Sequence, residues 1–456
     1  MAGIGFTLRR LSARDTYAGH LQAYAYSGLI SCGPWIISIF SIVALTMLFY
    51  GRIEDAEMRL FSSTITHVYA LSLILVGPLQ LVLTRFVADQ FSAKTPEKIF
   101  PSAIGALGLT GLLAALAGGV FFFGFVPGSL LYQASAAALM VCVAAIFIIA
   151  NYLNAVREYG TVVLAFFIGY GASVAAAFGG ALSLGAEGAV LGFTLGHMVL
   201  LLLLIYALHR EFGGRVARRS GVAAHFRRFP GLMLCGLLYS LGIWIDKFLF
   251  WHLSHQNIEV SGALHAAPEY DMAIYLSLLS IAPGLAVFVL RLETDFAERY
   301  EAFFTAIREG GSLAQIREAR DAIADSLRSG FSLLFRVQGL TTVLLAIFAY
   351  ILPNLVTIGA VQLGIFRVTL FGAFLLVIFL SLLTVLFYFD DRGGALLCSG
   401  AFLFANASFS IATVWQNEAW YGFGFVIASA LAALIAGARV NKRLRHLEYH
   451  IFAGAR

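Results

Sequence analysis

Residues 231–253 read GLMLCGLLYSLGIWIDKFLFWHL, an apolar run that contains one aspartate and one lysine. A helix of roughly 20 apolar residues crosses a bilayer core about 30 Å thick and satisfies its own backbone hydrogen bonds there. The run therefore predicts a transmembrane helix. Its charged residues, Asp246 and Lys247, are costly in lipid and usually face a water-filled cavity or a partner.

The same apolar character extends along the whole chain of 456 residues. Hydrophobic residues make up 60% and charged residues only 12%, against about 25% charged residues in an average soluble domain. This excludes a soluble enzyme, a nucleic-acid-binding domain and a disordered chain. Runs of spanning length lie near residues 24–50, 61–87, 102–126, 132–155, 161–183, 188–208, 231–253, 269–290, 330–352, 365–388, 395–415 and 421–438.

The distribution of positive charge predicts the orientation of these twelve helices. With the amino terminus inside, cytoplasmic segments contain 24 of the 30 Lys and Arg residues, and the periplasmic loops contain only Arg52 and Arg59. Cytoplasmic loops of membrane proteins carry an excess of Lys and Arg. We therefore expect a multi-pass protein of the bacterial inner (cytoplasmic) membrane with both termini in the cytoplasm.

The order of spans and loops predicts two six-helix lobes. They are residues 1–208 (helices one to six) and 231–438 (helices seven to twelve), with a basic cytoplasmic linker at 209–230 and a basic cytoplasmic tail at 439–456. Within the second lobe, residues 291–328 are typical of two short amphipathic helices broken at Gly310 and Gly311. Ser312 with Gln315 matches a capping box. These helices lie at the membrane surface in one interpretation and dock a cytoplasmic protein in the other.

A repeated pattern of residues supports the two-lobe prediction. The first span contains S-x-G-x-W-I at 31–36, and the seventh contains it again at 240–245. Tyr69, Arg85 and Asp89 in the second span recur with the same intervals as Tyr275, Arg291 and Asp295 in the eighth. Because many transporters consist of duplicated halves, we expect two pseudo-symmetric lobes around a central cavity.

The charged residues within and beside the spans are the candidate functional residues. Asp246 lies toward the periplasmic side of helix seven, where it contacts substrate or a coupling ion, or else only pairs with another helix. Consecutive residues point about 100° apart on a helix, so we expect no ideal pair with Lys247, which in the structural alternative extends to the outer interface. Arg85 with Asp89 and Arg291 with Asp295 form a cytoplasmic gate, or else each arginine is only tied to the carboxylate four residues later.

Other polar and aromatic residues in the spans are candidates for the same substrate path, although packing explains most membrane aromatics. They are Asn151, Asn154, Arg336, Trp35, Trp244, Tyr69 and Tyr275. Amides suit the hydroxyl and acetamido groups of a sugar, and aromatic rings stack on sugar faces. The sequence shows neither a phosphate-binding P-loop nor zinc-ligand spacing, so we expect no cofactor, no metal and no catalytic residue.

Several stretches of this sequence resemble the PelG family of Pel exopolysaccharide transporters. They are MAGIGF at 1–6, GLISCGPW at 28–35, WIDK at 244–247 and RLETDFAERY at 291–300. Thr7 departs from the acidic residue expected in relatives. The resemblance covers essentially the whole chain and implies the twelve-helix, two-lobed fold of the multidrug/oligosaccharidyl-lipid/polysaccharide (MOP) flippase superfamily.

The resemblance also implies a substrate and partners. The family's role would be to move the Pel polymer, rich in N-acetylgalactosamine and N-acetylglucosamine, across the inner membrane for biofilm matrix export. Expected partners are the Pel glycosyltransferase and the membrane proteins PelD and PelE. Two alternatives stay open from the residues alone. One is a small-molecule exporter of the same superfamily, and the other is a membrane glycosyltransferase using Glu259, Glu269 and Asp271.

Overall fold

Nearly all of the described chain is helical. The computed structural model describes Gly28, Gly33 and residues 36–154, 159–213, 220–351 and 359–448. Up to residue 268 the elements are the helix Ile36–Phe49, α3 (Asp55–Ser92), a 3-10 turn (Pro96–Lys98), α4 (Ile99–Phe125), α5 (Leu130–Asn154), α6 (Tyr159–Phe212), α7 (Val222–Arg228), α8 (Pro230–Leu253), β1 (Ile258–Ser261) and β2 (Leu264–Ala266).

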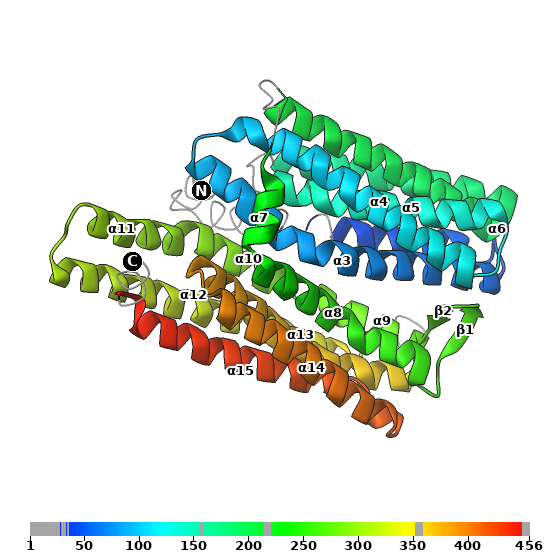
Figure 1. The fold of residues 1–456 in the computed structure, drawn as a ribbon. Helices are drawn as coiled ribbons and strands as arrows, with labels where there is room; N and C mark the ends of the chain where they lie inside the picture. Colours follow the sequence, from blue (N-terminus) through cyan, green and yellow to red (C-terminus); the bar gives the residue numbers. More distant parts are fainter. Residues whose placement is uncertain are drawn as a thin grey trace, which may run out of the picture. The chain divides into compact units, whose positions relative to one another are not determined.

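The remaining elements are also helices, most of them long (Figure 1). They are α9 (Pro268–Leu279), α10 (Ala282–Arg291), a π-helical turn (Leu292–Phe296), α11 (Ala297–Arg308), α12 (Leu313–Phe348), α13 (Ala360–Tyr388), α14 (Arg392–Val414), a 3-10 turn (Glu418–Trp420) and α15 (Phe423–Arg445).

These helices confirm the predicted polytopic fold. Ten helical segments of the described residues are long and apolar enough to cross a membrane. One of them, α6, covers two predicted spans, because Leu184 and Gly185 leave the helical conformation and turn the chain. With the shorter helix Ile36–Phe49, every one of the twelve predicted spans has a helical counterpart, the first of them only from Ile36 onward.

Glycine makes the turn within α6 possible. Gly185 has φ of +59°, a conformation that favours glycine over residues with a Cβ. The helices before and after the turn approach each other closely. A Cβ on Gly180, before the turn, would lie 2.1 Å from the carbonyl oxygen of Gly188, after it. Small residues allow membrane helices to pack at this distance, so α6 forms a tight pair of helices.

Contacts along the chain define two compact units, one over residues 34–268 and the other dominated by residues 269–456. In the first unit, α8 packs against α3, and a Cβ on Gly236 of α8 would lie 2.1 Å from the carbonyl oxygen of Gly77 of α3. This close crossing places α8 in the same unit as α3. The lobe boundary at the linker 209–230 stays a prediction.

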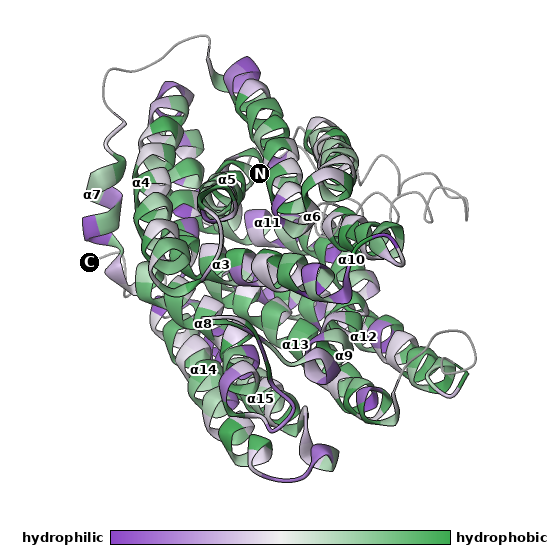
Figure 2. Cartoon of the chain, turned by 90° about the vertical axis from the view of Figure 1, so that its right-hand side faces the viewer, coloured by the Kyte–Doolittle hydropathy of each residue, from purple (hydrophilic) through white to green (hydrophobic). Residues whose placement is uncertain are grey.

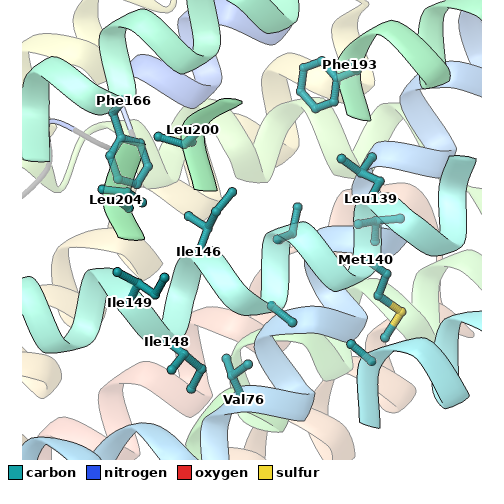
Figure 3. Close-up of a cluster of buried hydrophobic side chains, with 14 of the residues drawn as sticks. Val76, Leu139, Met140, Ile146, Ile148, Ile149, Phe166, Phe193, Leu200 and Leu204 are labelled. Carbon is teal, nitrogen blue, oxygen red and sulfur yellow. The ribbon is translucent and has the colours of Figure 1, made fainter. Parts of the chain in front are cut away.

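The core of the first unit is formed by α3, α5 and α6. Figure 3 shows side chains from these helices interlocking, and all of those labelled are buried. They are Val76, Leu139, Met140, Ile146, Ile148, Ile149, Phe166, Phe193, Leu200 and Leu204. In lipid the hydrophobic effect does not drive helices together, so van der Waals contacts in such dense packing are one of the main interactions that hold them.

Outward-facing positions are apolar as well, as the green of the long helices in Figure 2 shows. On α4 the exposed side chains include Leu112, Leu116 and Val120, with exposed fractions of 59%, 59% and 64%. On α12 they include Leu340 and Leu344. A soluble protein rarely exposes apolar patches of this extent, so these faces contact lipid.

The expectation of separate surface helices at 291–328 is wrong for the second of them. The break at Gly310 and Gly311 is confirmed, and so is the capping box between Ser312 and Gln315. However, α12 runs without interruption for 36 residues, or about 54 Å at 1.5 Å per residue. It is therefore a transmembrane helix with an extension beyond the length of a span.

The apolar stripe of this extension packs against protein. Ile316, Ile323 and Leu327 are buried, and α11, with its buried Phe303, packs along α12 (Figure 1). Leu313, which precedes these residues on the same apolar face, is exposed. We call α11 and the first half of α12 (residues 297–328) the cytoplasmic hairpin, after the side of the membrane on which the charge distribution predicts it. Because these apolar residues pack α12 against α11, the charged residues of the hairpin lie on its exposed faces.

Candidate functional site

The two charged residues of α8 form a buried ion pair. Lys247 Nζ lies 3.1 Å from Asp246 Oδ1 and 3.2 Å from Oδ2, and it also donates to the carbonyl oxygen of Ile243 at 2.8 Å. The relative exposure of Asp246 is 0% and that of Lys247 is 1%. The expectation that these neighbours cannot pair well is therefore wrong, and Lys247 does not extend to an interface.

The length of the lysine side chain explains this correction. The backbone points the two Cβ atoms about 100° apart, but four flexible methylene groups allow the ammonium to fold back toward both Asp246 and the preceding turn. The indole of Trp244 lies near the ammonium, with 5.9 Å from Nζ to the ring centroid. Asp246, Lys247 and Trp244 thus form one buried polar group on α8.

Arg85 and Asp89 lie at one end of α3 as an i,i+4 ion pair. Arg85 Nε is 3.1 Å from Asp89 Oδ1, and both side chains are about one-third exposed. The other carboxylate oxygen, Oδ2, lies 3.3 Å from His225 Nε2 on α7. The guanidinium of Arg85 also lies over the ring of Phe229, 5.7 Å from its centroid. Asp89 thereby connects α3 to the basic linker.

The second copy of the motif has the same local geometry. Arg291 Nη1 donates to Asp295 Oδ2 across one turn, and its side chain is as exposed as that of Arg85. The local arginine–carboxylate pairs of the structural alternative are thus present in both copies. Their role as a gate stays a prediction. In this copy the pair joins the last residue of α10, Arg291, to the π-helical turn that leads into α11.

Tyr69 belongs to a buried polar network that the sequence did not reveal. His197 Nδ1 lies 2.9 Å from the carbonyl oxygen of Phe193, which can only accept, so Nδ1 carries the hydrogen. Nε2 then accepts from the Tyr69 hydroxyl at 3.0 Å, and Tyr69 in turn hydrogen-bonds to the Tyr170 hydroxyl. The network joins α3 to both halves of α6.

Two serines extend this network. Ser173 Oγ lies 3.1 Å from His197 Nδ1 and donates to the carbonyl oxygen of Gly169, and Ser38 hydrogen-bonds to Tyr170. An intramembrane histidine is by itself a signal of a functional or structural polar site. His197 lies in the apolar run 188–208 and could have been noticed on that ground, although its partners could not.

The other predicted path residues have varied surroundings. Asn151 accepts from Thr84 Oγ1 at 3.0 Å and donates to the carbonyl oxygen of Gln80 at 3.1 Å, so its amide connects α5 to α3. Asn154 is exposed at the end of α5, Arg336 is exposed on α12, and Tyr275 is partly buried on α9. Trp35 lies outside the described residues.

The three acidic residues of the glycosyltransferase alternative do not lie within one element. Glu259 is exposed on β1, whereas Glu269 and Asp271 lie in the first turn of α9. In the described parts of the chain, no group of three or more His, Cys, Asp and Glu residues could hold a metal ion.

Comparison with solved structures gives the class of protein. A MOP superfamily transporter from Pyrococcus furiosus matches with a TM-score of 0.67 and 13% identity, covering 98% of this chain and 97% of that chain. An outward-facing multidrug resistance MATE transporter gives 0.67 at 14% identity, over 98% and 99% of the two chains. An inward-facing one gives 0.58 at 13% identity, over 93% and 95%. The chain has the fold of MOP superfamily transporters.

The family follows from the sequence itself. A family model described as "PelG: Putative exopolysaccharide Exporter (EPS-E)" matches residues 1–452. The chain belongs to this PelG family of exopolysaccharide exporters, which confirms the resemblance noted from its motifs. A comparison with curated proteins found no significant sequence match.

Proposed function

We propose that this chain moves the Pel exopolysaccharide, rich in N-acetylgalactosamine and N-acetylglucosamine, from the cytoplasm to the periplasm for the biofilm matrix. The observation that carries the proposal is the family match over residues 1–452 of a chain with a MOP transporter fold. The polymer passes through the cavity predicted between the lobes. Charged and amide groups of the spans offer hydrogen bonds to its hydroxyl and acetamido groups.

Within this proposal, the intramembrane charges act on the polymer path. The ion pair of Asp246 and Lys247 is neutral overall, which lowers the cost of burying each charge. A sugar hydroxyl that approaches the pair can donate to the carboxylate and accept from the ammonium. Arg85 and Arg291 form the cytoplasmic gate, each held in position by its own carboxylate.

The cytoplasmic hairpin is the proposed docking surface for the glycosyltransferase that synthesises the polymer, with PelD and PelE as further partners. Its apolar stripe is occupied by the packing of α11 on α12, so the available contacts are charged, among them Arg299, Glu301, Arg317 and Glu318. The positive-inside distribution supports the placement of this hairpin and both termini in the cytoplasm.

The docking proposal predicts a loss of copurification. Arg299→Glu with Arg317→Glu on the hairpin reverses two exposed charges and should reduce recovery of the glycosyltransferase with the affinity-tagged chain. Arg59→Glu, an exposed arginine on the predicted periplasmic side, is the matched control and should leave recovery unchanged. Equal recovery with the native chain, the double variant and the Arg59→Glu control would contradict docking at the hairpin.

Export by cells tests the transport function directly. Cells that synthesise the polymer but lack this chain should retain it inside, and the chain should restore polymer at the cell surface. A variant with Glu259, Glu269 and Asp271 all replaced by their amides should restore export as well. Abolished polymer synthesis in that variant would favour the glycosyltransferase alternative over transport.

A further inference from the structure

Span eight is divided in the middle of its apolar run. It consists of α9, which ends at Leu279, and α10, which begins at Ala282. Pro283 lies in the first turn of α10. Proline has no N–H to donate, and its ring clashes with the carbonyl four residues earlier. The sequence predicts a kink at Pro283, and the structure shows that the α-helix is interrupted just before it, at Ser280 and Ile281.

A side chain from another helix fills the break. Gln338 of α12 is completely buried. Its Nε2 donates to the carbonyl oxygen of Ser280 at 2.9 Å, and its Oε1 accepts from the N–H of Gly284 at 3.1 Å. In a continuous α-helix, these same two backbone groups would bond to each other, since Gly284 follows Ser280 by four residues. The amide is therefore inserted into one helical hydrogen bond.

Glycine at 284 makes the insertion possible. A Cβ at this position would lie 2.5 Å from Gln338 Oε1 and 3.2 Å from a methyl carbon of Leu334. The three residues Pro283, Gly284 and Gln338 thus act together: proline opens the helix, glycine gives access, and the amide satisfies the opened bond. In lipid, a freed backbone group needs such a partner because water is absent.

We propose that Gln338 is a positioning residue that sets the bend of span eight during transport. With the amide inserted, α9 and α10 are separate segments. When the amide withdraws, the Ser280 carbonyl accepts the Gly284 N–H directly and the helix becomes continuous there. The inserted arrangement has one hydrogen bond more and also satisfies the buried amide of Gln338, so it is the favoured state, and a step of the transport cycle must offset that difference to withdraw the amide.

This switch lies at the base of the cytoplasmic hairpin. From the break, α10 continues through the π-helical turn into α11, and α12 packs along all three segments. A change of direction at residues 280–284 would therefore move the hairpin and the Arg291–Asp295 pair together. The assignment of this movement to polymer export rests on the proposed function, whereas the switch itself does not.

The repeat offers an internal control. Pro78 in the first half lies at nearly the same depth as Pro283 in the second, and α3 continues through it without interruption from Asp55 to Ser92. The break is consequently not an inevitable effect of proline at this depth. The interruption lies where the amide of Gln338 is inserted, between Ser280 and Gly284 of span eight.

Distance measurement between spin labels across the break tests the switch. Labels at Met272→Cys on α9 and Ala302→Cys on α11, both exposed, are placed in the full chain in lipid nanodiscs, with the native cysteines replaced by alanine. In a straight helix the 30 intervening steps span about 45 Å. Gln338→Leu should shift the measured distances toward that value, because the Ser280 and Gly284 groups can then satisfy only each other.

Two further variants make the result decisive. Pro283→Ala restores an N–H and should shift the distances in the same direction while Gln338 is retained, which covers the case in which Gln338→Leu fails to insert. Thr342→Val removes a buried hydroxyl one turn away on α12, whose Oγ has no hydrogen-bond partner among the described residues. It should leave the distances unchanged.

Unchanged distances in both Gln338→Leu and Pro283→Ala would overturn the proposal. The measurement needs neither polymer nor partner, so it can succeed even where the export function is refuted. In the export assay, Gln338→Leu should reduce polymer at the cell surface at equal amounts of membrane-inserted protein. Thr342→Val should export normally.

Discussion

Asp246 and Lys247 are held in the membrane by each other. A single buried charge in a span is expensive, and a pair within hydrogen-bonding distance offsets much of that cost. Residue spacing alone suggested that adjacent positions would not pair, because it considers the backbone direction and ignores the length of the lysine chain. Asp246 therefore has a structural role as the partner of Lys247. A test of its proposed role in transport must separate that role from the structural one.

A double-variant cycle separates them. Asp246→Asn leaves the Lys247 ammonium buried without its carboxylate and should cost about 3–5 kcal/mol of unfolding free energy, seen as a lower melting temperature in detergent. Adding Lys247→Met removes the stranded charge and should restore most of that loss. We expect export to stay impaired in the double variant, since the polar group proposed to contact the polymer is gone. Restored export would reduce the pair to a structural element.

The matched arginines allow a second separation at the residue scale. Arg85→Glu combined with Arg291→Glu places a negative charge beside each acidic partner and should block export while the protein inserts normally. Exchanging Arg85 and Asp89 for each other rebuilds an i,i+4 pair in reverse order. A gate predicts that this exchange also lowers export, measured as polymer at the cell surface. Full export by the exchanged variant would show that local pairing is all these residues provide.

At the scale of elements, the sequence predicts most helices because lipid leaves the backbone few choices. Twelve apolar runs gave the spans, and Ser312 with Gln315 marked the start of α12. Interactions between helices were not predictable from spacing. His197 meets Tyr69 and Tyr170 only because α3 and both halves of α6 converge, and Gln338 gave no sign that its amide enters the break at Ser280. Such contacts depend on helix packing, which one sequence does not specify.

A buried carboxylate, that of Asp391, links the last two helices, α14 and α15. Asp391, the N-cap residue of α14, has a side chain that is only 1% exposed. It accepts hydrogen bonds from Arg439 and Arg443 of α15 and from the backbone N–H of Gly394. Burial alone would raise the pKa of the Asp391 carboxyl, but these hydrogen bonds outweigh it and hold the pKa well below its ordinary value. The carboxylate thus joins α14 to α15.

This cluster predicts a pH-dependent stability. Asp391→Asn should lower the unfolding free energy by about 2 kcal/mol at neutral pH, since hydrogen bonds to charged groups are lost. Because the folded-state pKa is depressed, the difference from the native chain should be constant above the ordinary carboxyl pKa of about 4 and should shrink as the pH falls below it. Thermal unfolding from pH 8 to pH 3.5 measures this. A difference that grows on acidification would contradict the assignment.

At the scale of the whole molecule, the amount and location of charge predicted the class of protein. Scarce charge required a membrane, the positive-inside asymmetry gave an orientation, and the repeated Tyr–Arg–Asp intervals gave a duplication. The structure agrees at each copy, where Arg85–Asp89 and Arg291–Asp295 form equivalent pairs. The substrate could not be derived in this way, because apolar spans are common to all transporters of this fold. Family membership gives only the class of substrate, an exopolysaccharide, so the particular polymer is the point most in need of measurement.

Reconstitution tests the central claim most directly. The chain is placed in proteoliposomes with the Pel glycosyltransferase outside and a labelled UDP-N-acetylhexosamine supplied there, with and without a proton gradient. We predict labelled polymer inside the vesicles, protected from added glycosidase, only when this chain is present. The gradient arm shows whether polymer synthesis alone drives entry. Polymer that is made but remains entirely digestible outside would contradict the claim that this chain is the exporter.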